Sequence, residues 1–162
     1  MAARRSAGLL IYRRHRGVLQ VFLVHPGGPY WRNKDEGAWS VPKGEYDDDE
    51  DPFAAAQREF QEETGIIVAG AFTPLEPVRQ AGGKVVQAWA LQADFDAADL
   101  CSTTFEMEWP PRSGRRQSFP EIDRGSWFDL DEAGCKILAG QRPLLDQLAR
   151  VLASSGTDDT KR

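Results

Sequence analysis

Runs of apolar residues at the start of the chain predict two β-strands. Segments 6–12 ("SAGLLIY") and 18–25 ("VLQVFLVH") are apolar and rich in residues that favour strands, and the charged stretch "RRHRG" separates them. This pattern is typical of two strands joined by a turn. Because few positions in either segment are polar, we expect both strands to lie inside a sheet.

A helix is predicted over Pro52–Thr64. Asp51 can cap its N-terminus with a carboxylate, and Pro52 takes the first helical position, where its missing N–H costs nothing. Alanines at positions 54–56 favour the helix, and Gly65 provides a C-terminal stop. Local signals therefore define both ends of this element.

The second half of the chain alternates further strands with two helices. The pattern predicts a hairpin from 72–80 and 84–94 about a Gly-Gly turn, a strand and then a long proline-rich loop over 104–121, a last strand at 125–130, and helices at 131–140 and 142–153. No repeat or linker divides the chain. We expect an α/β (α+β) fold, a mixed β-sheet flanked by helices, in one domain over residues 1–153 with a flexible tail over 154–162.

Composition and charge narrow the possible functions. A chain of 162 residues is long enough for one domain with a real core. Its formal net charge of −5 argues against a general nucleic-acid-binding protein, which would need a basic face. The only two cysteines, Cys101 and Cys135, are far apart and in no paired motif, so we expect them to be buried small apolar residues in a reducing compartment.

Membrane insertion and export are also disfavoured. No apolar run approaches the roughly 20 residues that a membrane helix needs. The early pair Arg4-Arg5 precedes a short apolar run that breaks at Arg13, too early for the apolar core of a signal peptide. We therefore expect a cytoplasmic protein with no membrane partner.

Three glutamates stand out on the predicted helix. Glu59, Glu62 and Glu63 lie within an arc of roughly 100°, because residues three and four apart share a helix face. Carboxylate oxygens grouped in this way suit a hard cation such as Mg²⁺. A solvated acidic helix face is the alternative, and the glutamate spacing alone leaves it open.

A calcium loop is excluded for the acidic run at 47–51. Asp47, Asp49 and Asp51 alternate as at the start of an EF-hand loop. However, Pro52 stands where that loop requires glycine, and Arg58 stands where it requires the closing glutamate. We interpret the run as a solvated loop that ends in the helix N-cap.

The segment 44–66 reads glycine, five residues, glutamate, seven residues, then "REFQEETGI". This spacing resembles the signature of the Nudix hydrolases over 23 residues, with every fixed charged and glycine position present. Phe60 departs from the pattern, because the family usually has an aliphatic residue there. The side chain stays apolar, so we expect an effect on core packing alone. The resemblance implies a Nudix-like α/β/α sandwich.

The resemblance also implies roles for the residues that match the signature. Divalent cations, Mg²⁺ or Mn²⁺, would be held by the catalytic glutamates Glu59, Glu62 and Glu63 and by the backbone carbonyl of Gly44. One of these carboxylates, such as Glu59, could instead orient or deprotonate a water molecule. The motif's structural positions would be Glu50, Arg58 and Gly65, the first two forming an ion pair between the loop and the helix.

The activity implied by the resemblance is metal-dependent hydrolysis of a pyrophosphate bond, by attack of water on phosphorus. The partner would be a small nucleotide, with a nucleoside triphosphate or dinucleoside polyphosphate preferred over a nucleotide sugar, and the enzyme would be a monomer or homodimer. Three alternatives stay open. They are removal of pyrophosphate from RNA 5′ ends, a non-catalytic nucleotide sensor on the same fold, and a plain acidic interaction domain.

Residues outside the signature are candidates for substrate contacts. Lys43, next to Gly44, is placed to meet a phosphate or is a surface lysine in a turn. Tyr30 and Trp31 lie in a Gly/Pro-rich loop, where they could contact a nucleobase. Arg112, in the basic segment "PPRSGRR", could hold a polyphosphate or lie in a solvated loop.

A further acidic residue is expected at the site. Among the acids of the second half, Glu121 ranks first as an additional catalytic base or metal ligand, because it lies just before a predicted strand, where the resemblance to Nudix proteins implies an acidic residue supplied by a loop. Glu106 and Glu108 are the rivals for that role, and each of the three could be an ordinary exposed acid.

Overall fold

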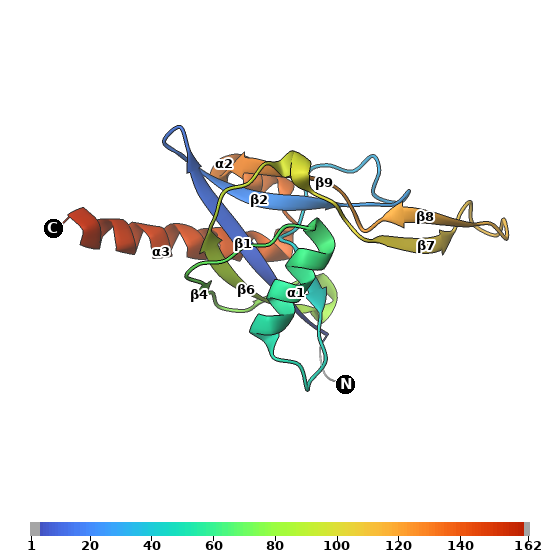
Figure 1. The fold of residues 1–162 in the computed structure, drawn as a ribbon, viewed down its shortest axis with the longest axis horizontal. Coiled ribbons are helices and arrows are strands. Elements are labelled where there is room, and N and C mark those ends of the chain that lie inside the picture. The colour runs from blue at the N-terminus through green and yellow to red at the C-terminus, as the bar shows by residue number, and fades with distance from the viewer. Residues whose placement is uncertain (1–3, 161–162) are drawn as a thin grey trace.

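The computed structural model describes residues 4–160, and their side chains as far as residue 154. These residues contain a seven-stranded mixed sheet in which the order is β4-β6-β1-β2-β9, with β3 paired to β1 and β5 paired to β6 (Figure 1). The pair β1–β6 is parallel and the other pairs are antiparallel. The strands are β1 (Arg5–His15), β2 (Val18–Pro26), β3 (Lys43–Glu45), β4 (Thr73–Pro74), β5 (Val78–Arg79), β6 (Val85–Gln92) and β9 (Ile122–Asp129).

Helices cover both faces of this sheet (Figure 1). The helices are α1 (Pro52–Thr64), α2 (Leu130–Lys136) and α3 (Arg142–Thr160). Leu9 and Phe22 belong to the core cluster that contains Phe60 of α1, whereas Leu10 belongs to the cluster that contains Leu144 of α3. Successive strand residues thus serve opposite faces, as the two-residue period of a strand requires. The predicted α/β class, a mixed sheet between helices, is confirmed.

Helix α1 begins and ends where the sequence predicts. The Ala54 N–H donates to the Asp51 carboxylate at 2.9 Å. Gly65 has a φ of 72°, in the left-handed region, and its N–H donates to the Gln61 carbonyl at 2.8 Å. Both caps are made by the residues that the pattern indicates, so the helix carrying the three glutamates has fixed ends.

The first hairpin is longer than the sequence predicts. Strand β1 continues to His15, and only Arg16 and Gly17, with φ of 52° and 79°, form the turn. The charged stretch remains extended in pairing with β2, and Arg13 finds side-chain partners there. The Arg13 guanidinium stacks 4.2 Å from the Trp127 ring and donates to Gln20 at 2.9 Å.

The predicted long loop over 104–121 contains a second strand. Strands β7 (Thr104–Glu108) and β8 (Arg116–Pro120) form an antiparallel hairpin that is a sheet of its own and projects from the body of the molecule (Figure 1). The prediction of a loop is wrong for Arg116–Pro120. This segment carries one large apolar residue, Phe119, and its strand conformation depends on pairing with Phe105 across the hairpin.

The prediction that both cysteines are buried is also wrong, because Cys101 and Cys135 are exposed. On α2, Ala133 faces the core, and a residue two positions later turns by about 200° to the outside. Among the described residues, no helix is long and apolar enough to span a membrane. The division into a domain over 1–153 and a tail over 154–162 stays a prediction, and residues 161–162 lie outside the described residues.

Candidate active site

Strand β3 brings the backbone of Gly44 against α1. A Cβ atom placed on Gly44 would lie 2.0 Å from Cδ and 2.1 Å from Oε2 of Glu59. No side chain fits at position 44, and the Glu59 carboxylate lies directly over the Gly44 backbone. Only 16% of the Glu59 side chain is exposed. The Glu59 carboxylate and the Gly44 backbone are thus held together in a mostly buried place.

Glu63 lies one turn further along α1 and is also held by β3. The backbone N–H of Lys43 donates to Glu63 Oε2 at 3.1 Å. Burial raises the pKa of Glu63 to about 8, and the negative charge of Glu59 acts in the same direction. Burial raises the pKa of Glu59 as well. Two carboxylates therefore share a site where ionisation is costly unless a proton or a cation compensates.

Arg58 connects the remaining carboxylates of the signature. Its guanidinium contacts Glu50, with Nη2 2.9 Å from Oε2, as the expected ion pair. Its Nη1 lies 3.0 Å from Glu59 Oε1 and 3.3 Å from Glu62 Oε2. One cationic nitrogen thus touches both Glu59 and Glu62. The Glu62 side chain is 49% exposed and is the most solvent-facing of the three helical glutamates.

These residues fit a divalent cation, although the cluster is not preassembled. In the described part of the chain, no three Asp, Glu, His or Cys side chains are gathered into a metal site. Glu62 turns toward Arg58, while Glu63 turns toward Lys43. Even so, Glu59 interacts with both of the other helical glutamates. It shares the Arg58 guanidinium with Glu62, and its negative charge raises the pKa of Glu63. Such all-oxygen donors suit Mg²⁺ or Mn²⁺.

A cavity of about 220 Å³ opens beside Glu63. Four residues singled out from the sequence line it, namely Trp31, Lys43, Glu63 and Glu121. The rest of its lining is mostly apolar, including Val24, Pro26, Ala38, Val41, Ile122 and Leu138. The chain thus brings an ammonium group, two carboxylates and an indole to one concave site.

Charges at this cavity influence one another. Burial lowers the pKa of the Lys43 ammonium and the charge of Lys84 lowers it further, while Glu63 acts in the opposite direction. The charge of Glu121 contributes to the raised pKa of Glu63. Glu106 and Glu108, the rivals of Glu121, lie on β7 and do not line the cavity.

Two of the predicted substrate contacts lie outside the cavity. Tyr30 is 59% exposed, and its ring packs edge-to-face on Trp109 with centroids 5.3 Å apart. Arg112 lies in the turn between β7 and β8, with a φ of 62°. Neither residue lines the cavity beside Glu63.

His25 is a buried residue outside the cavity lining that supports the elements around the cavity, and the sequence offers no signal for it. It is fully buried, with Nδ1 2.9 Å from Asp123 Oδ1 and Nε2 2.6 Å from the Lys34 carbonyl. A carbonyl only accepts, so Nε2 carries hydrogen. His25 therefore ties β2 both to the loop that carries Trp31 and to the strand that follows Glu121. Its partners are 9 and 98 residues away, so no local motif indicates them.

Gln141 is a second residue without a sequence signal. It is fully buried, its Oε1 accepts from the Val41 N–H at 3.0 Å, and its Nε2 donates to Ser40 Oγ at 3.0 Å. Both partners line the cavity. Gln141, the residue just before α3, thus satisfies a backbone N–H of one cavity wall.

A sequence model of the NUDIX domain matches residues 2–150. The chain belongs to the Nudix family. Two curated relatives match shorter stretches. Nudix hydrolase 25 of Arabidopsis thaliana is 58% identical over 33 residues, 20% of this chain and 19% of that protein. RNA pyrophosphohydrolase of Caulobacter vibrioides (strain NA1000 / CB15N) is 39% identical over 62 residues, 35% of this chain and 36% of that protein. The chain therefore matches about a third or less of the length of these relatives.

Solved structures with the same fold match almost the whole chain. The C. elegans Ap4A hydrolase in a binary complex has a TM-score of 0.65 and 26% identity, over 94% of this chain and 99% of that chain. The NUDIX domain of Shewanella oneidensis NrtR, complexed with ADP ribose, has a TM-score of 0.63 and 18% identity, over 94% and 90%. The sandwich described above is thus the Nudix fold.

The raised pKa of Glu63 predicts a pH-dependent stability in metal-free buffer. Glu63 ionises near its ordinary value of 4.5 in the unfolded chain and near 8 in the folded one, so Nudix-fold stability falls as pH rises through that window. The Glu63→Gln variant lacks this loss. We expect its Tm, relative to that of the unsubstituted protein, to rise by several degrees between pH 5 and pH 8.5. A constant Tm difference in calorimetry would contradict the assignment.

Proposed function

We propose that the chain is a metal-dependent Nudix pyrophosphohydrolase that acts on a nucleoside triphosphate or dinucleoside polyphosphate. The observation that carries the proposal is the pair of mostly buried carboxylates, Glu59 and Glu63, set between the Gly44 backbone and a cavity that Lys43 also lines. Two carboxylates this close would repel an anionic substrate, and a cation bound between them and the substrate would remove that repulsion.

The residues divide the chemistry among them. Glu59, Glu62, Glu63 and the Gly44 carbonyl would hold Mg²⁺ or Mn²⁺. When bound, the cation neutralises phosphate charge and lowers the pKa of a coordinated water. Lys43 would offer its ammonium to a phosphate oxygen.

Two further cavity residues would contact the attacking water and the nucleobase. Glu121, which lines the same cavity as Glu63, would accept a hydrogen bond from the attacking water and take its proton. Trp31 would provide an apolar wall for the nucleobase.

The preference for nucleoside polyphosphates is supported by the likeness to the C. elegans Ap4A hydrolase, which has 26% identity over nearly the whole chain. Removal of pyrophosphate from RNA 5′ ends is the second candidate, and the similarity to the Caulobacter RNA pyrophosphohydrolase favours it. A non-catalytic sensor would be expected to lose at least one metal carboxylate, but this chain keeps all three.

A substrate screen tests the proposed function. ATP, diadenosine tetraphosphate, a nucleotide sugar and 5′-triphosphorylated RNA would each be offered with Mg²⁺ or Mn²⁺, and phosphate-containing products would be resolved by chromatography. We expect hydrolysis of ATP or the dinucleotide, faster than that of the nucleotide sugar, and complete loss after treatment with EDTA. Hydrolysis that persists after exhaustive chelation would refute the metal-dependent mechanism.

A further inference from the structure

The β7–β8 hairpin, residues 104–120, is here called the arm. Its base adjoins the candidate site, because the Glu121 N–H donates to the Thr103 carbonyl at 2.8 Å and the Gly27 N–H donates to the Glu121 carbonyl at 2.9 Å. From Thr104 to Glu108 the arm extends about 14 Å, since a strand rises about 3.4 Å per residue. The arm thus starts beside a cavity-lining carboxylate and leads away from the body of the molecule (Figure 1).

An aromatic path connects the cavity to the arm. Trp31 lines the cavity. Its neighbour Tyr30 packs on Trp109 at the far end of β7, with the ring centroids 5.3 Å apart. Closer to the base, a Cβ on Gly28 would lie 3.0 Å from Cζ of Phe105, so the loop follows the arm closely. Tyr30 remains 59% exposed, which leaves its ring open to a stacking partner.

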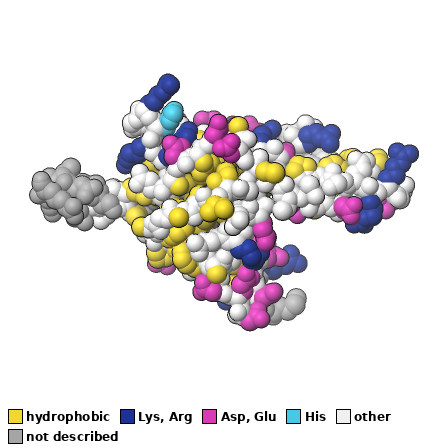
Figure 2. All heavy atoms as spheres, viewed as in Figure 1, with side chains coloured by type: hydrophobic (Ala, Val, Ile, Leu, Met, Phe, Trp, Pro, Cys, Tyr) yellow, Lys and Arg dark blue, Asp and Glu magenta, His cyan; other side chains and the backbone are white. Residues whose placement is uncertain are grey.

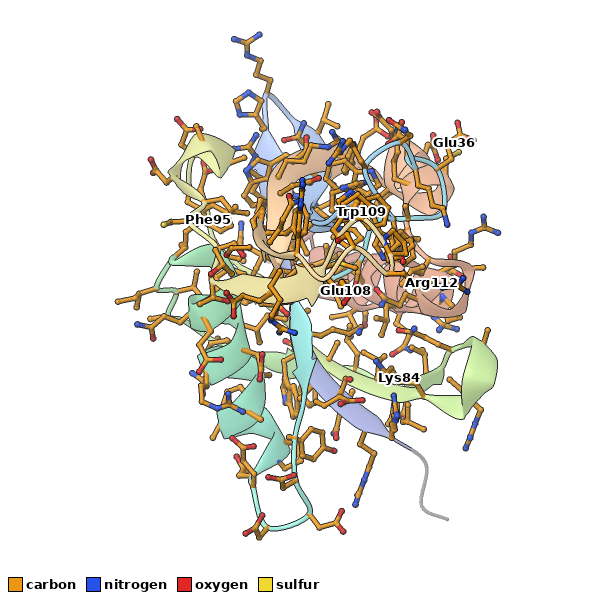
Figure 3. The ribbon with its side chains drawn as sticks, turned by 90° about the vertical axis from the view of Figure 1, so that its right-hand side faces the viewer. Glu36, Lys84, Phe95, Glu108, Trp109 and Arg112 are labelled. Carbon is orange, nitrogen blue, oxygen red and sulfur yellow. The ribbon has the colours of Figure 1, made fainter. Side chains whose placement is uncertain are left out.

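The free end of the arm is basic. Arg112, Arg115 and Arg116 are exposed, and none of their guanidinium groups forms a salt bridge with the residues whose side chains the structure describes. The turn that presents them is ordered by Glu108, whose carboxylate accepts from the Arg112 N–H at 2.7 Å. Figure 3 views the molecule from this side and shows Glu108, Trp109 and Arg112 at the end of the arm.

The positive charge at the arm stands out against the rest of the chain. The protein has a formal net charge of −5, and Figure 2 shows Lys or Arg side chains at the tip of the arm, with Asp or Glu side chains beside them. The three exposed arginines, which outnumber Glu108 at the turn, would attract an anionic ligand to the tip.

The cavity alone is too small for the whole of a large nucleotide. Its volume of about 220 Å³ is below the roughly 300–1,000 Å³ typical of sites that enclose a complete small ligand. A substrate with two nucleotides would therefore extend beyond the cavity. The aromatic path is the surface that continues from it.

We propose that the arm binds a second nucleotide of the substrate, with its base on Tyr30 and Trp109 and its phosphate on the arginines at the tip. This inference rests on the proposed function and narrows its substrate class to molecules that carry two nucleotides. The second nucleotide either lies on the other side of the scissile pyrophosphate or follows the first one in an RNA chain. A dinucleoside polyphosphate and the 5′ end of a single-stranded RNA both supply that unit. Base stacking on an aromatic ring is worth about 1–3 kcal/mol and tolerates any base.

Binding measurements test the role of the arm separately from hydrolysis. The Glu63→Gln background, with Mg²⁺ present, is expected to slow turnover about a thousandfold, so that binding can be measured before hydrolysis. Affinities for ATP, diadenosine tetraphosphate and a 5′-triphosphorylated trinucleotide would be compared in three proteins. These are the background itself, the background with Arg115→Gln and Arg116→Gln, and a matched control with Arg14→Gln and Arg150→Gln, two exposed arginines far from the arm in sequence.

We expect the arm substitutions to weaken binding of at least one two-nucleotide ligand about tenfold more than binding of ATP. They should also reduce the salt dependence of that binding, by about 0.7 in the slope of log K against log salt for each phosphate that an arginine no longer neutralises. The control substitutions should change neither. The ligand that responds identifies the source of the second nucleotide, the RNA end or the dinucleoside polyphosphate.

A second variant guards against a misfolded tip. Tyr30→Leu lies on the loop and leaves the arm's own sequence intact, and it should selectively weaken the same ligand. Three results would overturn the role of the arm. They are equal weakening for all three ligands, no weakening of any of them, and no measurable binding of either two-nucleotide ligand by the background protein. Failure of the proposed function appears instead in the screen, as absence of hydrolysis by the unsubstituted protein.

Discussion

The Glu63→Gln substitution is expected to lower kcat about a thousandfold while the protein remains folded. Glu63 is a mostly buried carboxylate beside Glu59, and its amide analogue can still accept the Lys43 N–H but carries no charge for a cation. Loss of about 4 kcal/mol of transition-state charge stabilisation corresponds to three factors of ten in rate. Steady-state kinetics on the best substrate from the screen, with Mg²⁺ at saturation, measures the effect.

Glu132→Gln is the matched control for that experiment. Glu132 is an exposed helical glutamate on α2, outside the cavity lining, and its removal should leave kcat within about twofold. If Glu63→Gln kept near-normal activity with a normal circular dichroism spectrum, the cation would have to be held elsewhere in the chain.

The Gly44→Ala substitution should reduce kcat a hundredfold or more. A single methyl group there would lie 2.0 Å from Glu59 Cδ, a distance that real Cβ atoms do not adopt. Either β3 or the Glu59 carboxylate must move, and a shift of about 1 Å at a catalytic group can cost a hundredfold in rate. We expect the loss in kcat to be accompanied by a higher Mg²⁺ concentration for half-maximal activity.

Gly134→Ala provides the comparison for Gly44→Ala. A Cβ at Gly134 meets no atom within 4 Å, and this residue lies in α2 with an ordinary helical backbone. Alanine there should be neutral or slightly stabilising. Activity of Gly44→Ala similar to that of Gly134→Ala would mean that the contact between Gly44 and Glu59 is unimportant for catalysis.

Features with local causes were predictable from the sequence. Helix α1 has its N-cap, its proline and its terminal glycine within the segment itself, and the structure places both ends where those residues stand. Strands β1 and β2 carry continuous apolar runs because both of their faces are covered. The glutamates of the signature could be located because their spacing is itself the signal.

Features that depend on distant partners were not predictable. Strand β8 has little apolar pattern of its own and exists because Phe119 meets Phe105 across the hairpin. The role of His25 depends on Asp123, 98 residues away. Even for the signature, helical spacing grouped Glu62 with Glu59 and Glu63, whereas the structure turns Glu62 outward onto Arg58 and Glu63 inward onto the cavity.

The position of Arg58 has a consequence for how the protein handles cations. Its guanidinium touches Glu50, Glu59 and Glu62 together, so the chain carries a built-in counter-ion that relieves repulsion along the helix before any metal arrives. Under the proposed function, an incoming dication would have to compete with this resident charge for Glu59 and Glu62, two of the three helical carboxylates. This competition would, under the proposed function, lower the affinity for the ion and favour its release after each turnover.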